Sequence, residues 1–298
     1  MSILIGWAEE SLVPEKKVSL AGQFFERISE YVESEISVTA MAVEADGEQM
    51  IMISCDVVGT ADHVIRMARE KFAKLNTEVD PRKLIISATH THTSLIIGTG
   101  STRNFSVQTQ ILEEFLPAGK KYNELVTPDE SVLTPLEGLE LLTDKIALAA
   151  DRAWKARKEA LYANEFGRVA VGMNRRVCYD DGSAQMWGDT NTANFVSLEG
   201  GNDSGVELIY TFDTNKKLTG IVANIACPAQ ILEQRSFISA DFWGRAKANL
   251  REKFGDDIFL LGLCGAGGDQ CPRDLVRWVN PETPIDDPNV KRRVLPAP

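Results

Sequence analysis

Two closely spaced histidines are the first residues of this sequence whose types and spacing could support chemistry. The chain has only three histidines, and two of them, His90 and His92, are separated by one residue. In an extended segment both imidazoles point to the same side, so they can share a metal ion, or one can bind a metal while the other contacts substrate. A pair of hydrogen-bonded loop histidines is the alternative interpretation.

Cys227 is a second candidate, because a β-rich run stops there and a proline follows. A thiolate at the end of a strand is a soft ligand that suits zinc. Free cysteines are also common as small buried apolar side chains, so Cys227 taken alone is a weak signal.

A glycine-rich turn follows the apolar run 258–263. Consecutive backbone N–H groups, such as those of Gly267 and Gly268, can converge on a phosphate or on the oxyanion of a tetrahedral intermediate. The segment matches neither phosphate-binding glycine motif, which disfavours nucleotides. Cys271 follows the turn and is a candidate nucleophile if a metal or a histidine lowers its pKa. A purely structural turn is the alternative.

Predicted strands place these residues at one end of a sheet. The runs 36–44 and 48–56 are typical of two strands joined by a hairpin at Ala45-Asp46-Gly47, and the second strand delivers Asp56 to a loop. The apolar strand 83–88 runs directly into the two histidines. Sites in α/β sheets usually lie at such carboxyl ends of strands.

Three predicted helices flank this sheet. Thr60 is expected to cap a helix that ends near Asn76 and buries Val64, Ala68, Phe72 and Leu75. A capping box at 134–137 begins the longest helix, and a third helix covers 241–254. With further strands at 167–173, 205–213, 219–226 and 258–263, the pattern predicts an α/β fold of mixed β-sheets with flanking helices. We expect a single large catalytic-type domain over residues 1–279 and an extended or mobile tail over 280–298.

The composition limits the class of protein. The 298 residues include 32 Lys and Arg against 43 Asp and Glu, a net charge of −11, which argues against nucleic acid or an anionic membrane as a partner. The longest apolar run, 258–268, is shorter than the roughly 20 residues of a membrane helix. Five cysteines without a dense spacing pattern favour a reducing compartment. We expect a cytoplasmic protein with a small-molecule substrate and no stable membrane insertion, and its oligomeric state stays open.

Taken together, several segments resemble the catalytic domain of the neutral/alkaline, non-lysosomal ceramidases over residues 3–273. The segments that carry this resemblance are Ile5-Gly6-Trp7-Ala8, Leu20-Ala21-Gly22, Ser54-Cys55-Asp56, Ser87–Ser94, Gly172–Arg176, Ile238–Phe242 and Gly268–Pro272. The resemblance implies that His90 binds zinc and that His92 lies in the active site. Cys271 stands where the family has its catalytic serine, and Cys227 where it has a second zinc-binding histidine.

The resemblance implies zinc-dependent hydrolysis of a linear amide (N-acyl) bond. Zinc on His90 and Cys227 would lower the pKa of bound water toward about 7. The catalytic set is then Cys271, His92 and Asp269. The family's remaining zinc ligands, a glutamate and a tyrosine, come from a later part of the chain, so we expect the domain to be incomplete on its C-terminal side.

Supporting residues follow from the same resemblance. The amides of Gly267 and Gly268 would hold the oxyanion, and Asp56 would orient a zinc-binding histidine. Three more residues are expected to contact substrate or to support the fold: Asn174, Arg175 and Asp241.

Two other functions compete with this one. The first is a metal-independent cysteine hydrolase in which His92 is the base for Cys271. The second is a catalytically inactive homologue that only binds a ligand. For the substrate we expect a small amide rather than ceramide, because the acidic chain has no recognisable membrane-binding surface.

Overall fold

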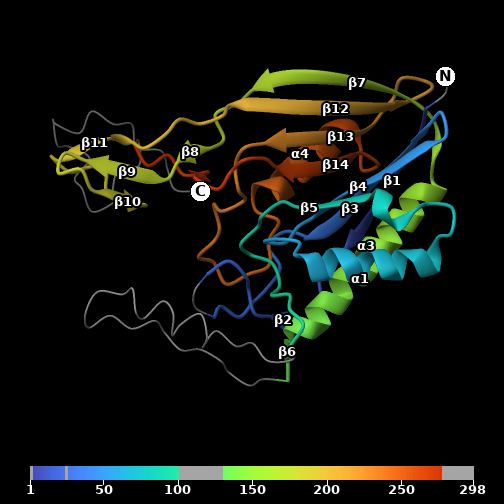
Figure 1. Cartoon of the computed structure of the whole chain (residues 1–298), viewed down its shortest axis with the longest axis horizontal. Helices are drawn as coiled ribbons and strands as arrows, with labels where there is room; N and C mark the ends of the chain where they lie inside the picture. Colours follow the sequence, from blue (N-terminus) through green and yellow to red (C-terminus); the bar gives the residue numbers. More distant parts are fainter. Residues whose placement is uncertain (1–2, 24–25, 101–129, 277–298) are drawn as a thin grey trace.

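The computed structural model describes residues 3–23, 26–100 and 130–276, which form a single α/β domain with a large mixed sheet, as predicted (Figure 1). The predicted tail at 280–298 lies outside these residues. None of the described helices is both long enough and apolar enough to cross a lipid bilayer. The main elements are β1 (Ile3–Ser11), β3 (Ser37–Ala45), β4 (Glu48–Cys55), α1 (Asp62–Leu75), β5 (Leu84–Ala88), α3 (Pro135–Lys155), β7 (Lys158–Arg168), β12 (Gly205–Asp213), β13 (Leu218–Ile225), α4 (Phe242–Phe254) and β14 (Phe259–Cys264).

The large sheet brings two parallel strand pairs together. Its order is β14-β13-β12-β7-β1-β3-β4-β5, in which β4–β5 and β13–β14 are parallel and the other pairs are antiparallel. Helices α1 and α4 supply the crossovers that parallel pairs require. The sheet curls until the two pairs meet, and there the Ser54 hydroxyl of β4 donates a 2.5 Å hydrogen bond to the Gly262 carbonyl of β14. The carboxyl ends of β5, β13 and β14 are therefore close together.

An aromatic pair fills the inside of this curl. The rings of Trp7 on β1 and Phe259 on β14 stack with their centroids 5.7 Å apart. The Trp7 indole N–H donates a 3.0 Å hydrogen bond to Thr211 Oγ1 on β12, which satisfies its buried polar atom. A Cβ at Gly220 would lie 2.5 Å from the indole, so β13 approaches Trp7 this closely only with glycine at that position.

Helices α1 and α3 cover the outer face of β1, β3, β4 and β5 (Figure 1). The predicted capping box is confirmed, because Thr134 Oγ1 accepts from the Glu137 N–H and a Glu137 carboxylate oxygen accepts from the Thr134 N–H. Five apolar side chains of the predicted stripe are buried against the sheet: Leu139, Leu142, Ile146, Ala149 and Ala153. On the other side of the curl, α4 packs its Trp243 over Gly262 of β14.

Helix α1 ends at Leu75 with Asn76 as its C-cap, as predicted, but its N-cap and the extent of its buried face differ from the prediction. Its N-cap is Ala61, which provides no side-chain hydrogen bond, so the assignment of Thr60 as the cap is wrong by one residue. Val64, Ala68 and Phe72 are buried as predicted. Leu75 is the last helical residue and is 50% exposed, so the buried face ends one turn earlier than its spacing suggested.

The predicted hairpin is confirmed, whereas one strand was misplaced. Asp46 and Gly47 both have positive φ, the geometry that suits a tight turn between twisted strands. The strand predicted at 167–173 is wrong, because β7 ends at Arg168. β7 pairs along the whole of β12 but through only three residues with β1. Most of its side chains are exposed on both faces. Its sequence therefore lacks the alternation of apolar and polar residues that indicates a strand.

Candidate active site

A cavity of about 270 Å³ lies at the carboxyl ends of β5, β13 and β14. We call it the histidine cleft. Its lining residues come from the ends of these strands and from the loops that follow them: Ala88, His90, Arg175, Pro228, Gln230, Cys264, Gly265, Gly267 and Gly268. The strand ends that the sequence analysis singled out thus meet at one cavity.

His90 lines the cleft, and one of its two ring nitrogens has a hydrogen-bond partner among the described residues. Its backbone has φ +63°, a left-handed conformation that is uncommon for a residue with a side chain. Its Nδ1 is 2.7 Å from the Val58 carbonyl. A carbonyl only accepts hydrogen bonds, so Nδ1 carries the proton and Nε2 keeps its lone pair. Burial lowers the pKa of His90, which favours this neutral form.

His92 is the more enclosed of the two histidines. The Gln230 amide donates to its Nε2 at 2.9 Å, so the proton of the neutral ring lies on Nδ1. That Nδ1 is 3.7 Å from a Glu233 carboxylate oxygen, and it faces the Gly22 backbone, whose hydrogen bond partly opposes the lowering of the pKa of His92. Burial, followed by the nearby charges of His90 and Arg27, lowers the pKa of His92 to about 3. A Cβ at Gly22 would lie 2.4 Å from the ring, which explains the glycine in the predicted Leu20-Ala21-Gly22 segment.

Three residues around His92 were not predicted from the sequence. Glu233 is 7% exposed, and its carboxylate lies 3.5 Å from Arg273. Burial raises the pKa of Glu233, although the charges of Arg273, Arg175 and Arg27 partly oppose this. Arg27 donates hydrogen bonds to the carbonyls of Ala21 and His92. These residues lie in segments without secondary structure, and no pattern in the sequence pointed to them.

The glycine turn is joined to the predicted segment at Asn174 and Arg175. β15 (Gln270–Cys271) pairs with β8 (Met173–Asn174), and the Asn174 amide donates to the Asp269 carboxylate at 2.8 Å. The Asp269 side chain therefore braces the turn. The Gly267 N–H donates to the Gly265 carbonyl at 2.7 Å and is used within the turn. The Gly268 N–H has no partner among the described residues.

Arg175 reaches the cleft from the other side of the same pairing. Its Nη2 donates to the Gly268 carbonyl at 2.7 Å, and its backbone N–H donates to the Asp269 carbonyl at 2.8 Å. Its Nε is buried and lacks a hydrogen-bond partner.

Cys271, the predicted nucleophile, and Cys227, the predicted zinc ligand, are both buried thiols. Cys271 is fully buried and donates to the Arg273 carbonyl at 3.3 Å. Burial raises the pKa of the Cys271 thiol. Cys227 donates to the Pro228 carbonyl at 3.6 Å, and burial raises its pKa to about 12. Thiols with raised pKa values are poor nucleophiles at neutral pH.

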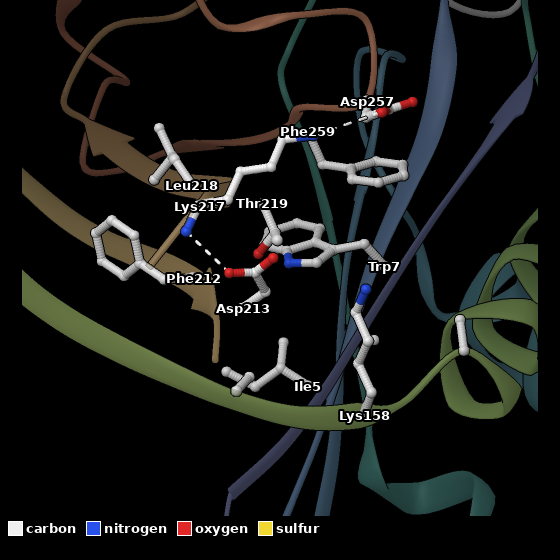
Figure 2. Close-up of a pocket in the computed structure, with 13 residues that line it drawn as sticks. Ile5, Trp7, Lys158, Phe212, Asp213, Lys217, Leu218, Thr219, Asp257 and Phe259 are labelled. Atoms are coloured by element: carbon white, nitrogen blue, oxygen red, sulfur yellow. Dashed lines mark hydrogen bonds and ion pairs between the residues drawn. The ribbon is translucent and has the colours of Figure 1, made fainter. Parts of the chain in front are cut away.

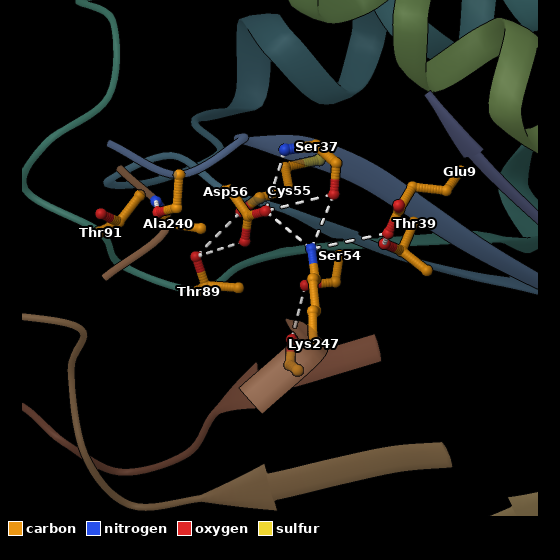
Figure 3. Close-up of polar contacts among 12 residues, drawn as sticks. Glu9, Ser37, Thr39, Ser54, Cys55, Asp56, Thr89, Thr91, Ala240 and Lys247 are labelled. Atoms are coloured by element: carbon orange, nitrogen blue, oxygen red, sulfur yellow. Dashed lines mark hydrogen bonds and ion pairs between the residues drawn. The ribbon is translucent and has the colours of Figure 1, made fainter. Parts of the chain in front are cut away.

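Asp56 and Asp241 have structural partners. Asp56 binds Lys247, Ser37 and Thr89 in a buried network beside the histidines (Figure 3). The carbonyl of Val58, and not the Asp56 carboxylate, bonds to the His90 ring. Asp241 caps α4, with one carboxylate oxygen accepting from the Phe242 N–H and the other from the Leu232 N–H, both at 2.7 Å.

The predicted zinc ligands lie in the same region, but the described residues do not complete a zinc site. The backbone N–H of His92 donates to the Ala229 carbonyl, two residues after Cys227. His90 and Pro228, the residue next to Cys227, line the same cavity. His90 fits one ligand position, because zinc-binding imidazoles usually donate their other N–H to such a carbonyl. A catalytic zinc takes three protein ligands. In the part of the chain that the structure describes, no group of three His, Cys, Asp or Glu side chains is arranged to hold a metal.

A second cavity, of about 290 Å³, lies at the opposite, amino ends of β13 and β14 (Figure 2). It is lined by the Trp7 and Phe259 rings and by charged side chains such as Lys158. Lys217 and Asp257 on its rim approach to 3.7 Å. None of the predicted catalytic, zinc-binding or substrate-binding residues lines this cavity, whereas several of them line the histidine cleft. The histidine cleft is therefore the candidate active site.

Comparisons with known proteins find a similarity of fold. No family model and no curated protein matches the sequence. The chain is similar to the crystal structure of neutral ceramidase from Pseudomonas aeruginosa, with a TM-score of 0.69 and 15% identity over 96% of this chain and 42% of that one. It is also similar to a structure of ceramidase complexed with C2, with a TM-score of 0.65 and 15% identity over 91% of this chain and 39% of that one. The chain thus spans about two fifths of the length of these proteins.

Proposed function

We propose that the histidine cleft hydrolyses the linear amide bond of a small N-acyl compound. The observation that carries this proposal is the His90 ring, which keeps an unprotonated Nε2 and lines the same cavity as Gly268. The similarity of fold to neutral ceramidases, and the resemblance of the sequence segments that form this cleft, support the same reaction class.

The chain's own residues can assist both halves of amide hydrolysis. A neutral imidazole with a free lone pair can take a proton from an attacking water molecule. The partner-free Gly268 N–H is the amide of the turn that is available for the developing oxyanion, and such a donor contributes about 3 kcal/mol to the transition state. His92 supports His90 from behind, because the two rings are in edge contact with centroids 4.9 Å apart.

The size of the cleft supports a small substrate. About 270 Å³ is just below the range of roughly 300–1,000 Å³ that is usual for pockets that hold drug-sized ligands. We place the reaction in the cytoplasm, which is supported by five free cysteines in the structure.

Zinc enters this proposal through the sequence resemblance and not through the described donor set. A zinc ion on His90 Nε2 would take the place of the general-base role of that ring, because the same lone pair cannot hold the metal and accept a proton. Zinc binding is tested by elemental analysis of the purified chain. About one zinc per chain, lost in His90→Ala, supports it, and metal-free protein that retains full activity contradicts it.

The cysteine hydrolase has less support. The Cys271 thiol donates to a backbone carbonyl, and His92 Nε2 is bound to Gln230, so neither group is directed at the other. Full activity of a Cys271→Ala variant would exclude this alternative.

The proposed function is tested by assaying a panel of N-acyl amides with His90→Ala and, as a matched control, His63→Ala. We expect His90→Ala to lower kcat/KM by at least about 100-fold, the usual contribution of a positioned acid–base group. His63 lies in the first turn of α1, does not line the cleft, and its substitution should leave the rate unchanged. Binding without turnover by the wild type would favour the inactive homologue.

A further inference from the structure

The surface of the histidine cleft carries one formal charge, which is positive. Among its lining residues, Arg175 is the one side chain with a permanent charge, and the one histidine, His90, directs its Nδ1 at the Val58 carbonyl. No carboxylate is among these lining residues. This contrasts with the whole chain, whose net charge of −11 alone would suggest a neutral or cationic substrate.

The acidic side chains near the cleft are engaged with other groups. Glu233 lies 3.5 Å from Arg273, which is a nearer partner than Arg175, although the charge of Arg175 also acts on it. Asp269 accepts from the Asn174 amide. Asp241 accepts two backbone N–H bonds at the start of α4. No carboxylate of the described residues forms an ion pair with Arg175.

Arg175 also has N–H donors that make no hydrogen bond among the described residues. One guanidinium nitrogen donates to the Gly268 carbonyl, which fixes the orientation of the planar group at the turn. The buried Nε–H has no acceptor among the described residues, and a buried donor without an acceptor costs free energy. A guanidinium with free N–H groups matches a carboxylate in both charge and shape.

We propose that the substrate of this cleft is an N-acyl amide that carries a carboxylate, and that Arg175 binds that carboxylate. This inference rests on the proposed function and adds the chemical class of the substrate. Arg175 is then the residue that determines specificity, and the neutral imidazole of His90 remains the group next to the scissile bond.

The test compares four amides of similar size that differ in charge. N-butanoylglycine carries the carboxylate on the amine side, and N-succinyl-ethylamine carries it on the acyl side. N-butanoyl-ethanolamine is neutral, and N-(2-aminoethyl)butanamide is cationic. We expect kcat/KM to be about 10- to 100-fold higher for one of the two anionic compounds than for the neutral one, the value of a charge-assisted hydrogen bond. The preferred anion identifies which side carries the carboxylate.

Variants at two adjacent arginines separate the role of Arg175 from a general charge effect. Arg175→Gln should bring the ratio of kcat/KM for the anionic and neutral compounds close to one. Arg175→Lys keeps the charge and should retain part of the preference, which also covers the case in which the glutamine variant folds poorly. Arg176→Gln is the matched control, because Arg176 pairs with Glu199 at 3.0 Å and does not line the cleft; it should retain the wild-type ratio.

The outcomes distinguish the two proposals. Efficient hydrolysis of the neutral or cationic amide, without preference for an anion, overturns the inference and leaves the proposed function intact. If none of the four is hydrolysed, titration calorimetry with both anionic compounds, N-butanoylglycine and N-succinyl-ethylamine, decides. Binding that Arg175→Gln weakens about tenfold or more supports the inference while the proposed function fails, and absence of binding overturns both.

Discussion

Two buried polar regions adjoin the Thr89–His92 segment, and they differ in how completely their hydrogen bonds are satisfied. On one side, both oxygens of Asp56 are bound, one by the Thr89 hydroxyl and the other by Lys247 and the Ser37 N–H (Figure 3). On the other side, Gln230 Oε1 and Arg175 Nε are buried without partners among the described residues.

This difference separates a structural role from a functional one. Buried polar groups in native proteins are nearly always paired, because each unpaired group costs roughly 1–3 kcal/mol. The Asp56 network meets that rule and ties β4 and α4 to the start of the histidine segment. The His92 region departs from that rule at two described atoms next to the histidine cleft, Gln230 Oε1 and Arg175 Nε. We interpret the first region as the support of the site and the second as the part that meets the substrate.

The largest expected effect is a loss of stability when the Asp56 network is broken. Lys247→Met removes the cation and leaves the 1% exposed Asp56 carboxylate without its ion-pair partner. Breaking a buried pair in this way costs about 3–5 kcal/mol, so we expect the free energy of unfolding in urea to fall by that amount. Lys253→Met, on an exposed position of the same helix, is the control and should change stability by less than about 0.5 kcal/mol. A loss below about 1 kcal/mol in Lys247→Met would show that this network does not support the site.

A smaller change in the free energy of unfolding is expected when His92 is titrated. The pKa of His92 is lowered from its ordinary value of 6.5 to about 3 in the folded chain. Between these two pH values the unfolded chain is protonated at His92 and the folded chain is not. The contribution of His92 to stability is therefore complete above pH 6.5 and is lost as the pH falls toward 3, by about 2 kcal/mol at pH 5.

This pH dependence is checked by urea unfolding between pH 7 and pH 5 for the wild type and for His92→Gln. The variant should have a shallower loss, whatever its absolute stability. Glu233 has the opposite sign, because its pKa is raised and its contribution is lost as the pH rises above 4.5. Glu233→Gln should therefore lose stability more steeply on acidification. Equal slopes in the wild type and His92→Gln would contradict the buried, neutral state of His92.

The parts of the fold that follow from local rules were predictable from the sequence. The Asp46-Gly47 turn and the Thr134–Glu137 capping box depend on residues a few positions apart, and both are confirmed. Strand β1 was not predicted. It lies between β3 and β7 with both faces largely buried, so its sequence lacks the alternation that indicates a strand.

The candidate site was predictable as a group of segments and not as a set of contacts. Residues with distinctive chemistry, such as His90 and Arg175, line one cavity. The group that fixes the His90 ring is the carbonyl of Val58. Every residue has a backbone carbonyl, so the amino-acid type at position 58 could not indicate this contact. Gln230 and Glu233 lie in an irregular segment after β13, where no periodic pattern shows which way a side chain points.

The smallest expected effect concerns the backbone of the two histidines. His90 has φ +63°, whereas His92 is not among the residues with positive φ. Left-handed backbone costs a residue with a Cβ roughly 1–2 kcal/mol relative to glycine. His90→Gly and His90→Ala both remove the imidazole, so we expect the glycine variant to be the more stable by about 1 kcal/mol in urea unfolding. At His92 the order should reverse, because glycine there adds freedom only to the unfolded chain, at a cost of roughly 0.5–1 kcal/mol relative to alanine. The same order at both positions would mean that His90 is not held in a strained backbone, and the cleft would then lose the feature that sets the direction of its imidazole.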